Sequence, residues 1–320
     1  MWDLDHWKWA AIRTIVNTRL YVTRSSWLAP TTQPDQVKIY QCRLYVYPCR
    51  VFVPRDHDIE AHPKLPLVIR VHGGGFIVNN PAVDDPLARH LANNAHCLVV
   101  SIDYGKAPQN KFPNGYEDVV AQALAIIDDP DLPIDKSRVV LSGTSAGGNL
   151  VLGAAQDSRL RGKLVGVNGV CPLVDVEQDA ATKIATRPDP SISDFIGDTY
   201  DGIAKLYLDG ANPPDLRDVR LSPMNFTARK DLPAHVLLIG VEHDMFCREA
   251  QDMFDKLKRL AEGGNDSQSV EWHQVAGQVH AFENFPIKDS IEKEQKRVEA
   301  VEQMYSDIAK WLRRVFAYDV

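Results

Sequence analysis

The segment 143–147, Gly-Thr-Ser-Ala-Gly, holds the residue type best suited to covalent chemistry in this chain, the serine at position 145. Residues 138–141 read as a buried strand and residues 146–155 as the start of a helix, so Ser145 falls on a sharp turn between them. Glycines on both sides of the serine leave room for a tight reversal of the chain. The pattern predicts that Ser145 presents its hydroxyl as a nucleophile at the end of a sheet.

A serine nucleophile needs a histidine as base, and the histidine needs a carboxylate that fixes its tautomer. When the serine lies on a strand-to-helix turn, the acid and then the histidine follow it along the chain. Asp244 directly follows the apolar run 237–241, and His280 stands in a loop after the last predicted strand. We therefore predict Ser145, Asp244 and His280 as the catalytic residues.

Three other side chains are candidates for the same roles. His273 lies in a stretch whose alternation predicts an edge strand, where a histidine is usually just exposed. Glu242 competes with Asp244 for the role of the acid, and Glu249 lies inside the next predicted helix. Asp244 itself has a structural alternative, because an aspartate at this place also caps a helix.

A glycine-rich loop could stabilise the oxyanion that forms when a serine attacks a carbonyl group. Gly73, Gly74 and Gly75 directly follow the predicted strand 67–71 and expose backbone N–H groups without side chains. The N–H of Ala146, the residue after the nucleophile, is the expected fourth donor. Each such donor contributes about 3 kcal/mol to the transition state. A purely structural glycine turn is the alternative.

The elements that must position these residues alternate between apolar strands and helices, which implies right-handed crossovers and a mainly parallel sheet covered on both faces. Residues 37–53 predict an antiparallel hairpin at a sheet edge, and residues 290–316 a long final helix. The predicted central strands are 65–71, 97–102, 138–141, 164–170 and 235–241, and the predicted helices are 85–94, 115–128, 146–155 and 247–261.

Two regions lie outside this alternation. Residues 1–30 have apolar side chains at helical spacing and predict an amphipathic opening helix, in which Trp2, Trp7 and Trp9 suit core packing better than a pocket wall or a membrane surface. Residues 185–223 are rich in Asp, Pro and Gly and interrupt the rhythm of strands and helices. We expect this second region to form part of a lid.

The composition is that of an ordinary globular protein. The 320 residues are 44% hydrophobic and carry a formal net charge of −7 without a basic stripe, so we expect one domain over residues 1–320 and no nucleic-acid partner. Five cysteines without a C-x-x-C pair favour reduced thiols over disulfides or a zinc site. The acidic N-terminus and the absence of an 18-residue apolar run predict a cytoplasmic protein without stable membrane insertion.

Together these motifs resemble those of the hormone-sensitive-lipase-like, or family IV, carboxylesterases of the α/β-hydrolase superfamily, over about residues 65–285. The resemblance implies an α/β-hydrolase fold, a triad of Ser145, Asp244 and His280, and a cap formed by about residues 1–40 and 185–223. The matching segments are the H-G-G-G-F loop at 72–76, the elbow at 143–148, the D-Y and A-P pairs within 101–108, the acid segment at 242–246 and the H-x-F segment at 280–282.

The chain departs from the family pattern at three places that bear on substrate choice. Gly105-Lys106 replaces an Arg-Leu pair, Thr144 replaces an aspartate, and Arg248 stands where an aspartate is usual. None of these residues belongs to the predicted triad.

We therefore expect hydrolysis of a small to medium carboxylic ester or lactone through an acyl-enzyme, without a metal or an organic cofactor. One alternative is a specialised biosynthetic enzyme that opens a lactone, deacylates, cyclises or dehydrates its substrate. A further alternative is a non-catalytic ligand receptor on the same fold. The final helix and the sheet edge could support a homodimer.

Overall fold

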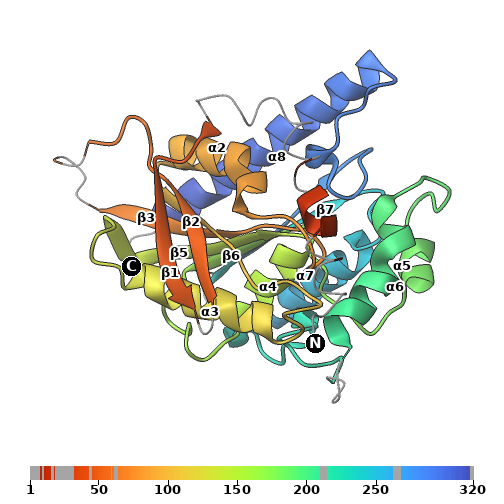
Figure 1. The fold of residues 1–320 in the computed structure, drawn as a ribbon, viewed down its shortest axis with the longest axis horizontal. Helices are drawn as coiled ribbons and strands as arrows, with labels where there is room; N and C mark the ends of the chain where they lie inside the picture. Colours follow the sequence, from red (N-terminus) through yellow and green to blue (C-terminus); the bar gives the residue numbers. More distant parts are fainter. Residues whose placement is uncertain are drawn as a thin grey trace.

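An eight-stranded sheet forms the centre of the molecule (Figure 1). The structure is a computed structural model that describes residues 8, 11–15, 18, 32–42, 45–58, 60, 64–209, 215–261 and 268–317. The strand order is β1-β2-β4-β3-β5-β6-β7-β8. Strand β2 runs antiparallel to both of its neighbours, β1 and β4, and every pairing from β4 to β8 is parallel. The strands are β1 (Gln36–Cys42), β2 (Tyr45–Phe52), β3 (Leu65–Val71), β4 (Leu98–Ile102), β5 (Ile134–Thr144), β6 (Gly166–Val170), β7 (His235–Val241) and β8 (Ser269–Val275).

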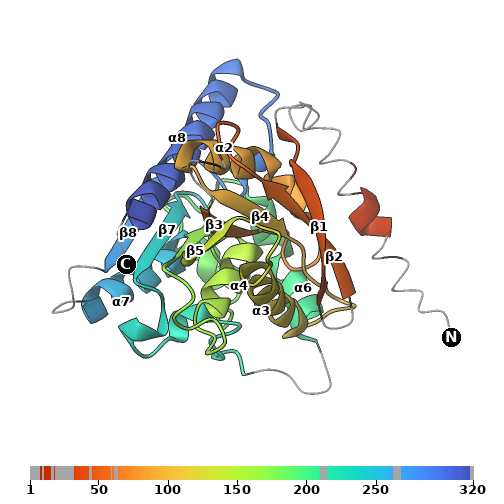
Figure 2. The ribbon, with the colours of Figure 1, turned by 90° about the vertical axis from the view of Figure 1, so that its left-hand side faces the viewer.

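Helices cover both faces of this sheet, and each face has its own apolar core. Helices α2 and α8 pack on one face, and α3, α4 and α7 pack on the other (Figure 2). The predicted α/β-hydrolase architecture, a mainly parallel sheet between helices, is confirmed. The helices are α2 (Asp85–Ala95), α3 (Asn114–Ile127), α4 (Ala146–Ala154), α5 (Ala180–Ala185), α6 (Phe195–Leu208), α7 (Cys247–Ala261) and α8 (Ile291–Ala317).

The chain before the sheet is described only in part. Positions 8, 11–15 and 18 are helical, in line with the predicted opening helix, whereas Trp2, Trp7 and Trp9 lie outside the described residues. The expected cap segment 1–40 extends too far, because β1 begins at Gln36 and pairs with β2 over its whole length. Strand pairing, which satisfies the backbone polar groups, assigns residues 36–40 to the sheet.

The region 185–223 contains a helix that its Asp, Pro and Gly content does not suggest. The carboxylate of Asp194 caps α6 by accepting a hydrogen bond from the N–H of Ile196 at 3.3 Å. Apolar side chains at positions 196, 200, 203 and 207 then recur every three or four residues and form one face. Helices α5 and α6 lie beside each other at the right of Figure 1. Among the described residues, no helix is long and apolar enough to cross a membrane.

Candidate active site

Ser145 lies on the turn between β5 and α4 with φ of 55° and ψ of −120°. A positive φ crowds the Cβ of a serine, so neighbouring structure must hold this strained backbone. Glycines permit the close approach: a Cβ on Gly143 would lie 2.2 Å from the carbonyl oxygen of Gly147, and a Cβ on Gly147 would lie 2.2 Å from that of Val71. The N–H of Ser145 donates to the carbonyl oxygen of Val170 at 2.8 Å. These contacts fix the turn at the carboxyl end of the sheet.

Three buried side chains from separate segments meet at this turn. His280, in the loop after β8, has its Nε2 atom 2.8 Å from the Oγ atom of Ser145. The Nδ1 atom of His280 lies 2.7 Å from the Oδ2 atom of Asp244, which follows β7. The other oxygen of Asp244 accepts a hydrogen bond from the N–H of Phe246 at 2.9 Å. The structure thus brings together the three residues that the sequence singles out for catalysis.

Burial and charge act in opposite directions on His280. Burial lowers the pKa of His280, but the negative charge of Asp244 raises it, and Cys171 adds to that increase. The net effect places the pKa of His280 well above its usual value. Because Asp244 accepts the hydrogen bond from Nδ1–H, the neutral ring presents the lone pair of Nε2 to Ser145. In that state the ring can accept the proton of the serine hydroxyl.

Two of the alternative candidates have other partners. His273 on β8 lies between the carboxylates of Glu271 and Asp307, at 3.8 and 3.7 Å. Glu242 accepts a hydrogen bond from the N–H of Gly277 at 2.6 Å. These contacts place neither side chain in a serine–histidine–acid arrangement.

The glycine loop after β3 lies against the serine turn. A Cβ on Gly73 would lie 3.3 Å from the Cβ atom of Ser145, so the two segments are in contact. Gly74 and Gly75 have φ values of 133° and 58°, which glycine adopts freely. Gly75 and Ala146 line the same pocket as Ser145. Ala146 is also the first residue of α4, where a backbone N–H has no acceptor within its own helix.

Contacts from distant segments hold this loop in place. Arg13, in the N-terminal segment, donates from Nε to the carbonyl oxygen of Ile77 at 2.8 Å and from Nη2 to that of Ala107 at 2.7 Å. The side-chain amide of Asn79 donates to the carbonyl oxygen of Gly73 at 3.1 Å. Arg13 therefore ties the N-terminal segment to the loop that carries the predicted oxyanion donors.

Lys106, one of the three departures from the family pattern, belongs to a charged cluster beside the glycine loop. It forms an ion pair with Asp103, whose Oδ1 atom also lies 3.0 Å from the Nε2 atom of His72. Burial raises the pKa of Asp103, but Lys106 and His72 lower it by more than burial raises it. The pKa of Asp103 therefore lies well below its usual value. The ring of His72 stacks on Tyr104 at a centroid distance of 4.7 Å. The cluster supports the start of the loop.

Of the other two departures, one is buried and one is exposed. Thr144 is buried and accepts a hydrogen bond from the guanidinium group of Arg70. The guanidinium group of Arg70 forms its ion pair with Asp84, at 3.1 Å. At position 144, where an aspartate is usual, Arg70 has a neutral hydroxyl group as its partner. Arg248 forms an exposed ion pair with Asp252 at 3.0 Å. Of the two, only Thr144 adjoins Ser145.

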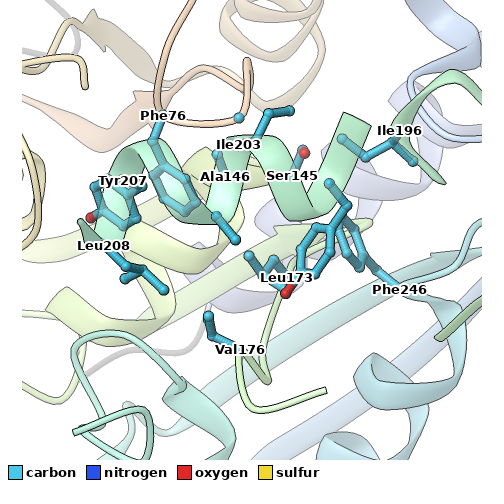
Figure 3. A pocket seen from close by; sticks show the side chains of 13 residues that line it. Phe76, Ser145, Ala146, Leu173, Val176, Ile196, Ile203, Tyr207, Leu208 and Phe246 are labelled. Atoms are coloured by element: carbon cyan, nitrogen blue, oxygen red, sulfur yellow. The ribbon is translucent and has the colours of Figure 1, made fainter. Parts of the chain in front are cut away.

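An apolar pocket adjoins Ser145 (Figure 3). Helix α6 supplies much of its wall. In Figure 3, Phe76 lies beside Tyr207, and Phe246 lies on the other side of the pocket. The rings of Phe76 and Tyr207 stack at a centroid distance of 4.0 Å. The lining residues are Gly75, Phe76, Ser145, Ala146, Leu173, Val176, Ile196, Tyr200, Ile203, Ala204, Tyr207, Leu208 and Phe246.

A buried ion pair joins helix α5 to helix α7 behind this pocket. The Nζ atom of Lys183 contacts the carboxylate of Glu249 and donates to the carbonyl oxygen of Asp175 at 2.5 Å. The same atom lies 5.5 Å from the ring centroids of Tyr200 and Phe246, which both line the pocket. Burial raises the pKa of Glu249 to about 7, although Lys183 opposes the shift. Glu249, an alternative for the catalytic acid, thus has a separate partner.

The roles of three residues around the candidate site were not predicted from the sequence. Arg13, Lys183 and Cys171 stand in no motif, and each reaches the site through a contact distant in sequence. The one available signal is a lysine as the single charged residue of the helical segment 180–185, which favours a buried, paired charge.

The chain belongs to the α/β-hydrolase fold family, whose model matches residues 68–284. Within that family it is a member of the hormone-sensitive-lipase-like, family IV branch of carboxylesterases, as the motifs predict. An arylesterase of Saccharolobus solfataricus is 29% identical over 288 residues, which cover 89% of this chain and 87% of that protein.

Solved structures of esterases share the fold. EstE1, a thermostable carboxylesterase cloned from a metagenomic library, superposes with a TM-score of 0.76 at 23% identity over 96% of this chain and 97% of its own. The esterase of Pyrobaculum calidifontis gives a TM-score of 0.73 at 24% identity over 94% and 93% of the two chains. At these identities the likeness establishes the common architecture.

Proposed function

We propose that this protein is a serine carboxylic-ester hydrolase that works through an acyl-enzyme. The observation that carries the proposal is the chain of two hydrogen-bond distances, 2.8 Å from Ser145 to His280 and 2.7 Å from His280 to Asp244. Buried together at the end of the sheet, these groups have the geometry of a nucleophile, a base and an orienting acid.

In the proposed reaction, the Oγ atom of Ser145 attacks the carbonyl carbon of the ester while its proton passes to the Nε2 atom of His280. Asp244 stabilises the imidazolium that forms. The N–H groups of Gly73, Gly74, Gly75 and Ala146 are the proposed donors to the oxyanion.

The tetrahedral intermediate then collapses, and the imidazolium gives its proton to the departing alcohol. A water molecule attacks the acyl-enzyme with the same ring as base, which releases the acid and restores the serine.

The pocket favours an ester with an apolar group of small to medium size, or a lactone. Its wall is almost wholly aliphatic and aromatic, and Phe76, Tyr207 and Phe246 offer flat surfaces to an aromatic group. The relative from Saccharolobus solfataricus is named an arylesterase, which agrees with that choice. We propose that the cap consists of the segment before β1 and residues 185–223, because α6 supplies much of the wall. A cytoplasmic location and a homodimer remain predictions.

The test is the hydrolysis of p-nitrophenyl acetate and butyrate and of phenyl acetate by the purified protein and by Ser145→Ala. Loss of the nucleophile should lower kcat by several orders of magnitude while thermal unfolding stays near that of the wild type. Ser101→Ala is the matched control, because Ser101 is also buried but lies in β4. Equal turnover by wild type and Ser145→Ala, or no turnover of any ester or lactone by the wild type, would overturn the proposal.

A further inference from the structure

Cys171 lies directly after β6, at the end of the sheet where the proposed triad meets. Its side chain is buried, and its φ of 38° is unusual for a residue with a side chain. The N–H of Cys171 donates to the carbonyl oxygen of Ile239 at 2.7 Å. This bond anchors the residue to β7, the strand that precedes Asp244. Both the strained backbone and its anchor fix where the thiol points.

The thiol belongs to a compact group of three metal-binding side chains. The Sγ atom of Cys171, a carboxylate oxygen of Asp244 and a ring nitrogen of His280 all lie within 4.8 Å of one another. All three residues are buried, at 1%, 1% and 2% exposure. They come from the ends of β6 and β7 and from the loop after β8, so the fold, and no local motif, assembles them.

The donor types and their separation fit a borderline-soft cation. Zinc binds thiolate sulfur at about 2.3 Å and imidazole nitrogen or carboxylate oxygen at about 2.0 to 2.2 Å, mostly in tetrahedral geometry. Donor atoms around such an ion are therefore about 3.3 to 3.7 Å apart. The separation of up to 4.8 Å between the donor atoms exceeds this spacing by about 1 Å, which is the adjustment that metal binding requires. Magnesium prefers six oxygen donors and is a poor match for this set.

We propose that Cys171, Asp244 and His280 form an inhibitory site for a thiophilic divalent cation such as Zn²⁺ or Cd²⁺. On binding, the thiol releases its proton to solvent and the thiolate becomes a ligand to the metal. The oxidation states of the protein and of the metal do not change. Three protein ligands leave a fourth position open for water or for the hydroxyl of Ser145.

Binding stops the reaction whichever ring nitrogen the metal takes. At Nε2 the metal occupies the lone pair that would receive the proton of Ser145. At Nδ1 it displaces the hydrogen bond to Asp244 and leaves the proton on Nε2, so the ring cannot act as a base. The cation can reach the site from the pocket, because Ser145 lines that pocket and contacts His280.

This inference depends on the proposed function only for the effect on rate, so the test measures binding as well. Zinc chloride, cadmium chloride and magnesium chloride are titrated against wild type, Cys171→Ala and Cys171→Ser. Ester turnover gives the inhibition constant, and competition with a zinc-binding dye gives the affinity. The matched control is Cys97→Ala, since Cys97 is equally buried but lies just before β4. The dye assay is repeated on Ser145→Ala, which keeps all three ligands.

We expect zinc and cadmium, but not magnesium, to inhibit the wild type and Cys97→Ala, and EDTA to restore activity. Changing an outer partner of a zinc ligand alone costs about 10- to 100-fold in affinity, so loss of the Cys171 ligand should raise the inhibition constant at least 100-fold. Cys171→Ser repeats the comparison if Cys171→Ala does not fold. Equal inhibition constants in wild type and the folded Cys171 variant, or no zinc binding to the wild type, would overturn the proposal. A protein without esterase activity whose zinc affinity still depends on Cys171 would contradict the proposed function and leave the metal site standing.

Discussion

Replacement of Lys183 by methionine tests whether its buried ion pair holds helix α5 against helix α7. Methionine keeps the length of the side chain but leaves the carboxylate of Glu249 buried without a counter-charge. Removal of one partner of a buried pair costs about 3 to 5 kcal/mol. Unfolding entropy of about 2.1 cal/mol/K per residue gives about 0.67 kcal/mol/K for 320 residues. A loss of about 4 kcal/mol should therefore lower the Tm by about 6 °C.

The assay is differential scanning calorimetry with two controls. Lys136→Met removes an exposed ion pair with Asp128, in which both side chains are more than half exposed, and should change the free energy of unfolding by less than about 1 kcal/mol. The double variant Lys183→Met with Glu249→Gln removes both buried charges and keeps a side-chain oxygen that can accept from the N–H of Val174. It should be more stable than Lys183→Met alone, because no uncompensated charge remains.

The pH dependence provides an independent check on the same pair. Because burial raises the pKa of Glu249 from 4.5 to about 7, the folded state holds a proton that the unfolded state releases between these values. The contribution of this group to stability is therefore complete below about pH 4.5 and is lost as the pH rises through 7. Lys183 opposes the upward shift, so Lys183→Met should raise the pKa of Glu249 further and extend this loss of stability to higher pH. The drop in Tm should therefore be largest above pH 7, and a Tm within 1 °C of the wild type at pH 8 would refute the account of the pair.

Three further changes test other parts of the site. Arg13→Gln removes the charge-assisted hydrogen bond to the carbonyl oxygen of Ile77, and such bonds contribute about 1.5 to 3 kcal/mol. We therefore expect kcat to fall about 10- to 100-fold, with KM less affected. An unchanged kcat would show that Arg13 does not position the glycine loop. Gly147→Ala introduces a Cβ 2.2 Å from a backbone carbonyl oxygen, so we expect little folded protein in a solubility and circular-dichroism assay, and a folded, active variant would contradict the close approach. Asp244→Asn should lower kcat by about 10⁴-fold. Because Asp244 raises the pKa of His280, the same change should shift the acidic limb of the pH–rate profile to lower pH. An unshifted limb would argue against the interaction between Asp244 and His280.

The core of the fold and the proposed triad could be predicted from sequence because each rests on a local pattern. Short, mainly apolar runs mark the buried strands, and the elbow glycines stand two residues to either side of Ser145 in the sequence. Asp244 and His280 follow strands that the same patterns identify. Chain order then suffices to relate the acid and the histidine to the serine.

Features that depend on tertiary contacts were missed. Helix α6 has few strong helix formers and is stabilised by its cap and by apolar packing over the pocket, so its composition suggested only a lid segment. Lys183 and Glu249 are 66 residues apart, and Arg13 reaches a carbonyl 94 residues away. Cys171 resembles any buried thiol until the sheet brings it beside His280.

Covalent labelling of the serine tests the central claim most directly. A fluorophosphonate probe should react once per chain in the wild type, and peptide mass spectrometry should place the adduct on Ser145. Labelling should be absent in Ser145→Ala and strongly slowed in His280→Ala, which lacks the base. An adduct on another residue, or no adduct on the folded wild type, would contradict Ser145 as the nucleophile of an acyl-enzyme mechanism.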